Sequence, residues 1–220
     1  MTAIRISVVG GLAVLLAGCF SGTQVVSSNQ GPTVSQAQAA PYDGPKQRIA
    51  VAGFETRSAK ASREIGSGMT DMLMDSLFNS NRFIVLERDR LSDVTREQDL
   101  QRGERFRQDT AAPAGQLEGA QLLVRGAITE FEPDCKGGSA ILISGKQACI
   151  GLNLRIVDVA TGRVVNATTV QATSADNRVG LVFAVGSMPF GLGSYSNTPM
   201  ERAIRNAIET AVHHIAQTKF

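Results

Sequence analysis

Three cysteines are the residues of this chain with the widest choice of chemistry. Cys19 comes directly after the triplet Leu16-Ala17-Gly18, whereas Cys135 and Cys149 form a separate pair in the second half of the chain. A thiolate is a nucleophile that can be acylated, and two thiols can close a disulfide in an oxidising compartment. The residues around each cysteine therefore decide which chemistry is expected.

The segment before Cys19 has the layout of a secretory signal peptide. Arg5 precedes an apolar stretch of about a dozen residues, which is shorter than the roughly 20 residues of a membrane-spanning helix. Ala17 and Gly18 look like a bacterial lipobox, in which cleavage follows Gly18 and the thiolate takes a diacylglyceryl group. We expect residues 1–18 to be removed and Cys19 to carry fatty-acyl (palmitate) chains. A signal peptide that ends by chance at a buried cysteine is the alternative.

Residues 19–45 are expected to tether the rest of the chain to the outer membrane. Each buried methylene of an acyl chain contributes about 0.8 kcal/mol, so two or three long chains make the attachment permanent. Phe20 stands where an acidic residue would retain a lipoprotein in the inner membrane. The stretch from Phe20 to Gly44 is rich in Ser, Gln, Gly and Ala, a composition typical of a flexible linker. The following domain should then face the periplasm.

Charge and motif content exclude several classes of function. The net charge is +2, and Lys and Arg alternate with Asp and Glu, so the basic stripe of a nucleic-acid binder is missing. No nucleophile, base and orienting group occur together, and no phosphate loop precedes a helix, so we expect neither an enzyme nor a cofactor. His213 and His214 lack further ligands at metal-binding spacing, so no metal site is expected.

Hydrophobic periodicity predicts one α/β (α+β) domain over residues 46–220. Strands are expected at 48–54, 83–87, 122–131, 152–159 and 163–170, and helices at 63–80, after a cap at Asp89, and from the capping box at Thr198 onwards. The polar stretch 102–110 is expected to be a loop. The turn Ala160-Thr161-Gly162 makes two strands antiparallel, so the sheet should be mixed and packed with helices.

Four segments resemble the CsgG/HfaB family of lipoproteins. They are Ile65-Gly-Ser-Gly-Met-Thr-Asp-Met-Leu, Phe83-Ile-Val-Leu-Glu-Arg-Asp-Arg-Leu, Gly119-Ala-Gln-Leu-Leu-Val-Arg-Gly and Leu152-Asn-Leu-Arg-Ile-Val-Asp-Val. The resemblance implies periplasmic domains that assemble into a homo-oligomeric ring, with two β-hairpins per subunit in one shared barrel. It also implies exported adhesin or curli-like fibre subunits and accessory assembly proteins as partners. The competing function is a non-channel periplasmic lipoprotein that binds and regulates a cell-envelope partner, as PelC and LpoB types do.

The first candidate hairpin, residues 132–151, carries Cys135 and Cys149 on opposite arms. Because an exported protein meets an oxidising compartment, we expect a disulfide here, with two free thiols as the alternative. A spanning strand needs about 9 to 11 residues. This hairpin therefore reaches across a bilayer only if both arms borrow residues from the flanking strands of the sheet.

The second candidate hairpin, residues 174–198, alternates large and small apolar side chains. Its candidate membrane or interface residues are Val179, Leu181, Phe183, Val185, Phe190, Leu192 and Tyr195. A lipid-facing strand and an apolar loop at a subunit interface both account for this pattern, and both stay open. The loop 55–62 lacks the aromatic residues that narrow the curli channel, so no constriction residues are transferred.

Overall fold

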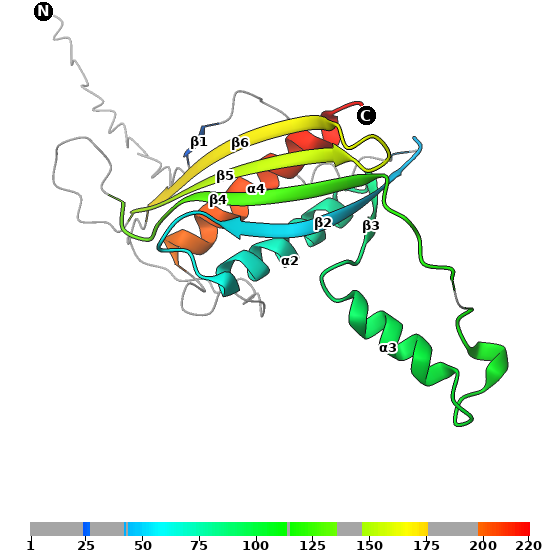
Figure 1. Cartoon of the computed structure of the whole chain (residues 1–220). Coiled ribbons are helices and arrows are strands. Elements are labelled where there is room, and N and C mark those ends of the chain that lie inside the picture. Colours follow the sequence, from blue (N-terminus) through cyan, green and yellow to red (C-terminus); the bar gives the residue numbers. More distant parts are fainter. Residues whose placement is uncertain (1–23, 27–41, 43, 114, 136–146, 176–197) are drawn as a thin grey trace, which may run out of the picture.

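The computed structural model describes residues 24–26, 42, 44–113, 115–135, 147–175 and 198–220. These residues form two layers, a twisted sheet and a pair of helices that cover one of its faces (Figure 1). The elements are β1 (Gln24–Val26), β2 (Gln47–Thr56), α2 (Arg63–Asn79), β3 (Phe83–Leu86), α3 (Leu91–Gln101), the 3-10 turn η1 (Gln108–Thr110), β4 (Leu122–Glu132), β5 (Gln147–Asp158), β6 (Val164–Ala175) and α4 (Pro199–Gln217).

The sheet has six strands in the order β1-β6-β5-β4-β2-β3. Strand β2 is parallel to both β3 and β4, while β4, β5, β6 and β1 pair antiparallel. The expected mixed, partly antiparallel sheet is thereby confirmed. Strands β5 and β6 have 12 residues each and are longer than predicted. The reason is that their ladder continues past the predicted alternation, up to the pair Gln147 and Ala175.

Both long helices begin at their predicted positions, Arg63 for α2 and the residue after Thr198 for α4. The Ser62 hydroxyl accepts a hydrogen bond from the Ile65 amide at the start of α2, and the Thr198 hydroxyl accepts one from the Glu201 amide at the start of α4. Pro199 occupies the first turn of α4, where its missing N–H costs nothing. The two helices contact each other and bury one apolar side each against the sheet.

The core lies between the sheet and these helices. Its largest fully buried side chains are Phe131, Ile49, Met69, Leu73, Leu77, Ile128, Ile150, Leu152, Leu154, Ile156, Met200 and Ile204. Each side chain of this size contributes about 1.5–3 kcal/mol when fully buried. The opposite face of the sheet carries no helix among the described residues, so its side chains remain available for other contacts.

Part of the expected flexible tether is ordered as a strand. Residues Gln24–Val26 form β1 and pair with β6 in the register Gln24 to Thr173. The physical reason is that β6 would otherwise leave its backbone N–H and C=O groups unpaired along an edge. Val25 and Val26 have the β-branched side chains that favour a strand. Two valines do not change the average composition of the stretch, on which the prediction of a flexible tether depends.

The start of α3 differs from its prediction. We expected Asp89 to cap this helix, but α3 begins at Leu91, and its N-cap is Arg90, which makes no side-chain capping bond. The Glu87 carboxylate instead accepts a hydrogen bond from the Arg90 amide at 2.9 Å, which moves the start of the helix by one residue. The expected loop at 102–110 contains one short 3-10 turn, η1. None of the helices in the described part of the chain is long and apolar enough to cross a membrane.

Candidate functional site

One end of the sheet collects the ends of three strands. Strand β4 ends at Glu132, β5 begins at Gln147 and β6 ends at Ala175. The register pairs Glu132 with Cys149 and Gln147 with Ala175, so these ends lie side by side. Figure 1 shows the strands converging at this end.

Helix α4 begins at the same end. The guanidinium of Arg202, in its first turn, donates a hydrogen bond to the Ser174 hydroxyl near the end of β6, at 3.4 Å. The two stretches that the sequence singles out, 136–146 and 176–197, therefore both leave and rejoin the described structure here. We call this part of the molecule the strand end; it comprises residues 132–135, 147–149, 173–175 and 198–202.

A disulfide lies at the strand end. Cys135 and Cys149 are bonded to each other, with their Cα atoms 5.8 Å apart. The amide of Cys135 also donates a hydrogen bond to the carbonyl oxygen of Gln147 at 2.8 Å. The bridge therefore joins the chain leaving β4 to a residue that is already inside β5.

Both arms of the first candidate hairpin, residues 132–151, continue strands of the sheet. Glu132 ends β4, and residues 147–151 belong to β5, which pairs antiparallel with β4. Ala148 and Ile150 are fully buried in the core, so they are not available to lipid. The remaining stretch, 136–146, is too short to supply two spanning strands of about 9 to 11 residues each.

The second candidate hairpin is described only at its two ends. Ser174 and Ala175 end β6, and Thr198 caps α4. The candidate residues Val179, Leu181, Phe183, Val185, Phe190, Leu192 and Tyr195 lie outside the described residues. The cleavage and lipidation residues Gly18 and Cys19 also lie outside them.

Two arginines face each other on the uncovered side of the sheet. Arg125 of β4 and Arg155 of β5 are Cα partners in the antiparallel register, and both side chains are exposed. Like charges directly opposite each other destabilise a sheet. Within the described residues neither arginine forms an ion pair. Both arginines act on Glu55, whose pKa is lowered mainly by the hydrogen bond and charge of Arg57 and less by Arg125 and Arg155.

An open groove of about 710 Å³ runs beside this pair of arginines. It follows β2 beyond Ala50, where β3 no longer pairs with that strand, and reaches Gly66 at the start of α2. Asn153 lines the groove, and its side-chain oxygen is buried without a hydrogen-bond partner in the described structure. The groove is lined by charges of both signs, with Arg57, Arg125 and Arg155 on one hand and Glu55 and Asp89 on the other, so it suits a polar ligand better than an apolar one.

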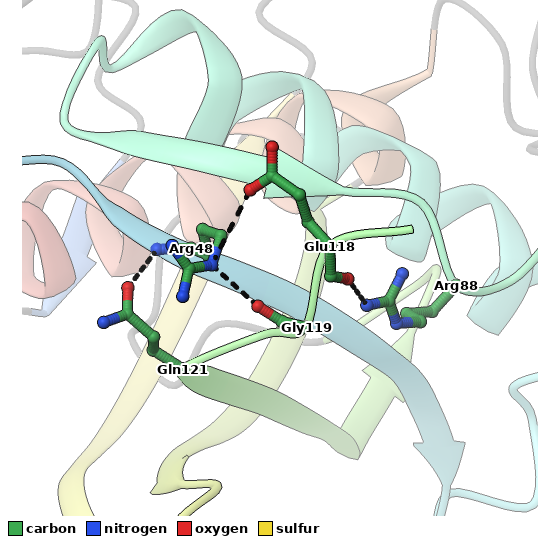
Figure 2. Close-up of polar contacts among 5 residues, drawn as sticks. All are labelled: Arg48, Arg88, Glu118, Gly119 and Gln121. Atoms are coloured by element: carbon green, nitrogen blue, oxygen red, sulfur yellow. Dashed lines mark hydrogen bonds and ion pairs between the residues drawn. The ribbon is translucent and has the colours of Figure 1, made fainter. Parts of the chain in front are cut away.

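The segment that carries α3 leaves the sheet after β3 and returns to it at β4, and its two ends are joined by polar contacts (Figure 2). Arg88, on the departing chain, donates a hydrogen bond to the carbonyl oxygen of Glu118 on the returning chain, at 2.7 Å. Arg48 of β2 donates to the Gly119 carbonyl at 2.8 Å and lies 3.6 Å from the Glu118 carboxylate, while its amide donates to the Gln121 side chain. These contacts hold the two ends of the segment together beside β2.

The two histidines, His213 and His214, both lie on α4. In the part of the chain that the structure describes, no group of three His, Cys, Asp or Glu side chains is placed to hold a metal ion. His213 lies on α4, and its Nε2 atom is buried without a hydrogen-bond partner there. Burial, and to a smaller extent the charge of His214, lowers the pKa of His213. The surroundings of His213 therefore favour its uncharged form.

Sequence reasoning missed the arginine pair. Arg125 and Arg155 both stand in predicted strands, at positions that alternate with apolar residues, so each could be assigned to the polar face. The sequence does not reveal the register between the two strands. That register, and not the composition, places the two charges next to each other.

A family model described as "Curli production assembly/transport component CsgG" matches residues 30–220. The chain belongs to the CsgG family. This confirms the resemblance inferred from the four sequence segments. The match includes the sheet from β2 onwards, the helices α2, α3 and α4, and both stretches that attach at the strand end.

Curated CsgG-family relatives come from enteric bacteria. The protein named Curli production assembly/transport component CsgG from Escherichia coli K12 is 28% identical over 168 residues, which cover 69% of this chain and 61% of that protein. The protein of the same name from Salmonella typhimurium has the same identity and coverage. The chain therefore matches 61% of the length of these relatives.

Solved structures give more distant similarities. The hypothetical protein CT253 from Chlamydia trachomatis has a TM-score of 0.47 at 15% identity, covering 78% of this chain and 96% of that one. The PelC dodecamer from Paraburkholderia phytofirmans has a TM-score of 0.42 at 11% identity, covering 87% and 95%. The LpoB C-terminal domain from Escherichia coli has a TM-score of 0.32 at 13% identity, covering 63% and 90%.

Proposed function

We propose that this CsgG-family chain is an outer-membrane lipoprotein that forms a homo-oligomeric ring for secretion, assembly or anchoring of surface adhesin or curli-like fibre subunits. The observation that carries the proposal is the family match over residues 30–220, which includes the whole described domain from β2 onwards. The curated relatives are named as curli production assembly and transport components, in agreement with this role.

The anchor of this proposal is the amino-terminal part of the chain. Residues 1–18 act as the signal peptide, cleavage follows Gly18, and Cys19 receives the lipid. Residues 19–45 then connect the membrane to the domain 46–220 on its periplasmic side. Lipidation would hold the subunits in one plane, which raises their local concentration for ring assembly.

The strand end is the part of the domain that we assign to the membrane side. The stretch 176–197 is long enough for two strands of about 9 to 11 residues, and it contains the apolar candidates from Val179 to Tyr195. The stretch 136–146 is too short for this. The Cys135–Cys149 bridge, formed after export, would join the end of β4 to β5 where that stretch begins and ends.

The test uses the full-length, lipidated protein extracted from membranes in mild detergent. Mass photometry should give a single species of several subunits, and negative-stain micrographs should show rings. Monomers at all concentrations, without rings, would contradict the proposal. The matched variant lacks residues 178–195. This deletion removes the candidate membrane residues of the second hairpin and keeps Ala175 at the end of β6 and Thr198 at the start of α4.

A second function is favoured by the short first stretch. Because 136–146 is too short for two spanning strands, each subunit contributes at most one membrane hairpin. A periplasmic lipoprotein that binds and regulates an envelope partner needs no membrane hairpin. Conductance in planar bilayers separates the two functions. A ring that exports subunits should give large, steady current steps, whereas a regulatory lipoprotein should give none.

A further inference from the structure

The two arginines on the uncovered face of the sheet lie opposite each other at a cost to the fold. Arg125 of β4 and Arg155 of β5 are register partners, both are exposed, and neither forms an ion pair within the described residues. Like charges directly opposite each other destabilise an antiparallel ladder. Natural proteins break a local rule of this kind mainly at functional sites. An anionic group between the two guanidinium groups would remove the repulsion and accept charge-assisted hydrogen bonds from both.

The same face of β5 carries a polar atom that also lacks a partner. Asn153 precedes Arg155 by two residues, so both side chains lie on the same face of the strand. The side-chain oxygen of Asn153 is buried and accepts no hydrogen bond in the described structure. A buried acceptor lowers stability until a donor reaches it. The group that binds at the arginines should therefore carry an N–H or O–H donor close to its negative charge.

The floor of the groove is formed by a small residue at this point. Asn153 is the register partner of Ala127, and Ala127 is the register partner of Glu55 on β2. All three residues line the groove, and the middle one offers only a methyl group. This arrangement leaves room for a ligand above β4, between the longer side chains of the neighbouring strands.

The negative charges of the groove are distributed differently from its positive ones. Glu55 accepts a hydrogen bond from Arg57 at 3.0 Å, so these two opposite charges balance each other. Asp89, which follows β3, lines the groove together with Ser67 and Thr70 of α2. Strand β2 separates β3 from β4 and β5 in the sheet, so this carboxylate lies on the other side of β2 from the arginine pair. A ligand that fits both sides must carry a negative charge and, further along, a positive charge.

We propose that the groove binds an extended peptide segment of another protein, with an acidic side chain between Arg125 and Arg155. The backbone N–H beside that side chain donates to the Asn153 oxygen, and a basic side chain a few positions further along meets Asp89. A peptide has a backbone donor next to its side chains, whereas an inorganic anion does not. The open groove follows β2 beyond Ala50, which suits an extended chain. The inference does not need the ring of the proposed function, because one subunit contains the whole groove.

The test is the binding of a fluorescently labelled synthetic peptide to the full-length protein in mild detergent, measured by fluorescence anisotropy. The probe has the sequence Gly-Ser-Thr-Glu-Thr-Gly-Lys-Ser-Gly, and its matched control carries Gln in place of Glu. The probe should bind saturably. The control should bind at least about tenfold more weakly, because it lacks the carboxylate that accepts charge-assisted hydrogen bonds. No saturable binding of the probe up to about 1 mM would overturn the inference.

Variants of the two arginines test where the probe binds. Arg125→Gln and Arg155→Gln should each weaken the binding at least about tenfold. Neither variant should lower the denaturation midpoint, since each removes a repulsion from the sheet. Arg163→Gln removes the same charge in the exposed turn between β5 and β6, away from the residues that line the groove, and should leave the affinity unchanged. An equal loss with Arg163→Gln would show general charge attraction and contradict the site.

Asn153→Leu tests the backbone contact, because leucine has a similar size and no acceptor. This variant should bind the probe about fivefold more weakly, which is the effect of one ordinary hydrogen bond. A probe with N-methylated amides at the glutamate and at the residue after it should show the same loss with the unmodified protein. The methylated probe should lose nothing further with Asn153→Leu. Additive losses would mean that the peptide amide and Asn153 do not meet, which contradicts the proposed contact.

Two outcomes would assign the groove to another occupant and overturn the inference. Inorganic phosphate that displaces the probe as well as the unlabelled peptide does would indicate a simple anion site. Binding that appears only after the oligomer is dissociated would indicate that a second copy of the chain covers the groove. Rings without peptide binding contradict this inference alone, whereas peptide binding by a chain that never forms rings contradicts only the proposed function.

Discussion

The ring of Phe54 lies directly over Gly126, its register partner across the β2–β4 ladder. A Cβ added at position 126 would come within 2.4 Å of a carbon of that ring. Both residues line the open groove, so this close approach also shapes the surface beside Arg125. The small size of residue 126 is therefore a packing requirement.

Gly126→Ala should destabilise the domain, because the Phe54 ring must leave its position. Overpacking of this kind typically costs about 1–3 kcal/mol of unfolding free energy. Chemical denaturation monitored by circular dichroism measures the loss. Gly119→Ala is the control, since no atom lies within 4 Å of a Cβ added there. In a Phe54→Ala protein, Gly126→Ala should lower the unfolding free energy clearly less than it does in the unmodified protein. An equal loss in both proteins would contradict the explanation.

Cys135→Ser should lower the stability of the oxidised protein by about 3 kcal/mol, the cost expected from loop-closure entropy for a loop of this length. The reason is that the bond to Cys149 restricts the unfolded chain between β4 and β5. Thermal unfolding with and without reductant measures it. Cys149→Ser and the double variant should match the single variant, and a reductant effect that persists in Cys135→Ser would show that this bridge is not its source.

The pH dependence of stability should carry a contribution from His213. Burial lowers its pKa in the folded state below the ordinary value of 6.5, so below that value the unfolded chain binds more protons than the folded one. The contribution is present in full above about pH 7.5 and is lost as the pH falls through 6.5 toward the lower folded pKa.

His213→Gln should flatten this part of the pH profile, because glutamine does not titrate. The measurement is the denaturation midpoint at a series of pH values between 5 and 8. His214→Gln removes only the smaller, electrostatic cause of the shift, so it should reduce the slope in part. A slope that is unchanged in His213→Gln would mean that another group controls this pH range.

Thr198→Ala should weaken the start of α4 by about 1 kcal/mol. The threonine hydroxyl accepts a hydrogen bond from the Glu201 amide at 3.3 Å, and alanine leaves that donor without this acceptor. Thr198→Ser keeps the hydroxyl and should retain most of the stability. Denaturant midpoints of the three proteins check the prediction, and a serine variant as unstable as the alanine variant would show that the methyl group matters instead.

Cys19→Ser should release the protein from the membrane. Without the thiol no diacylglyceryl group can be attached, so the chain loses the energy of about 0.8 kcal/mol for each buried methylene. Fractionation after labelling with radioactive palmitate measures both effects. Cys135→Ser is the control and should keep the label, while a labelled, membrane-bound Cys19→Ser protein would contradict the anchor.

The sequence by itself determined the secondary structure and the buried sides of the long elements. The capping box at Thr198 and the apolar spacing along α2 and α4 are local properties, so they can be recognised without knowing the fold. The family resemblance is likewise local, because it depends on runs of neighbouring residues. Composition misjudged only short pieces, such as Gln24–Val26, whose order depends on a distant strand edge.

The tertiary structure alone decided which distant residues meet. A strand register is fixed by long-range packing, and a shift of one residue would turn every side chain to the other face. Register placed Arg125 opposite Arg155 and put Cys149 inside β5, opposite Glu132. The exposure of α3 is likewise decided by the whole fold. The 11 residues of this helix do not reveal that none of them is buried in the described structure.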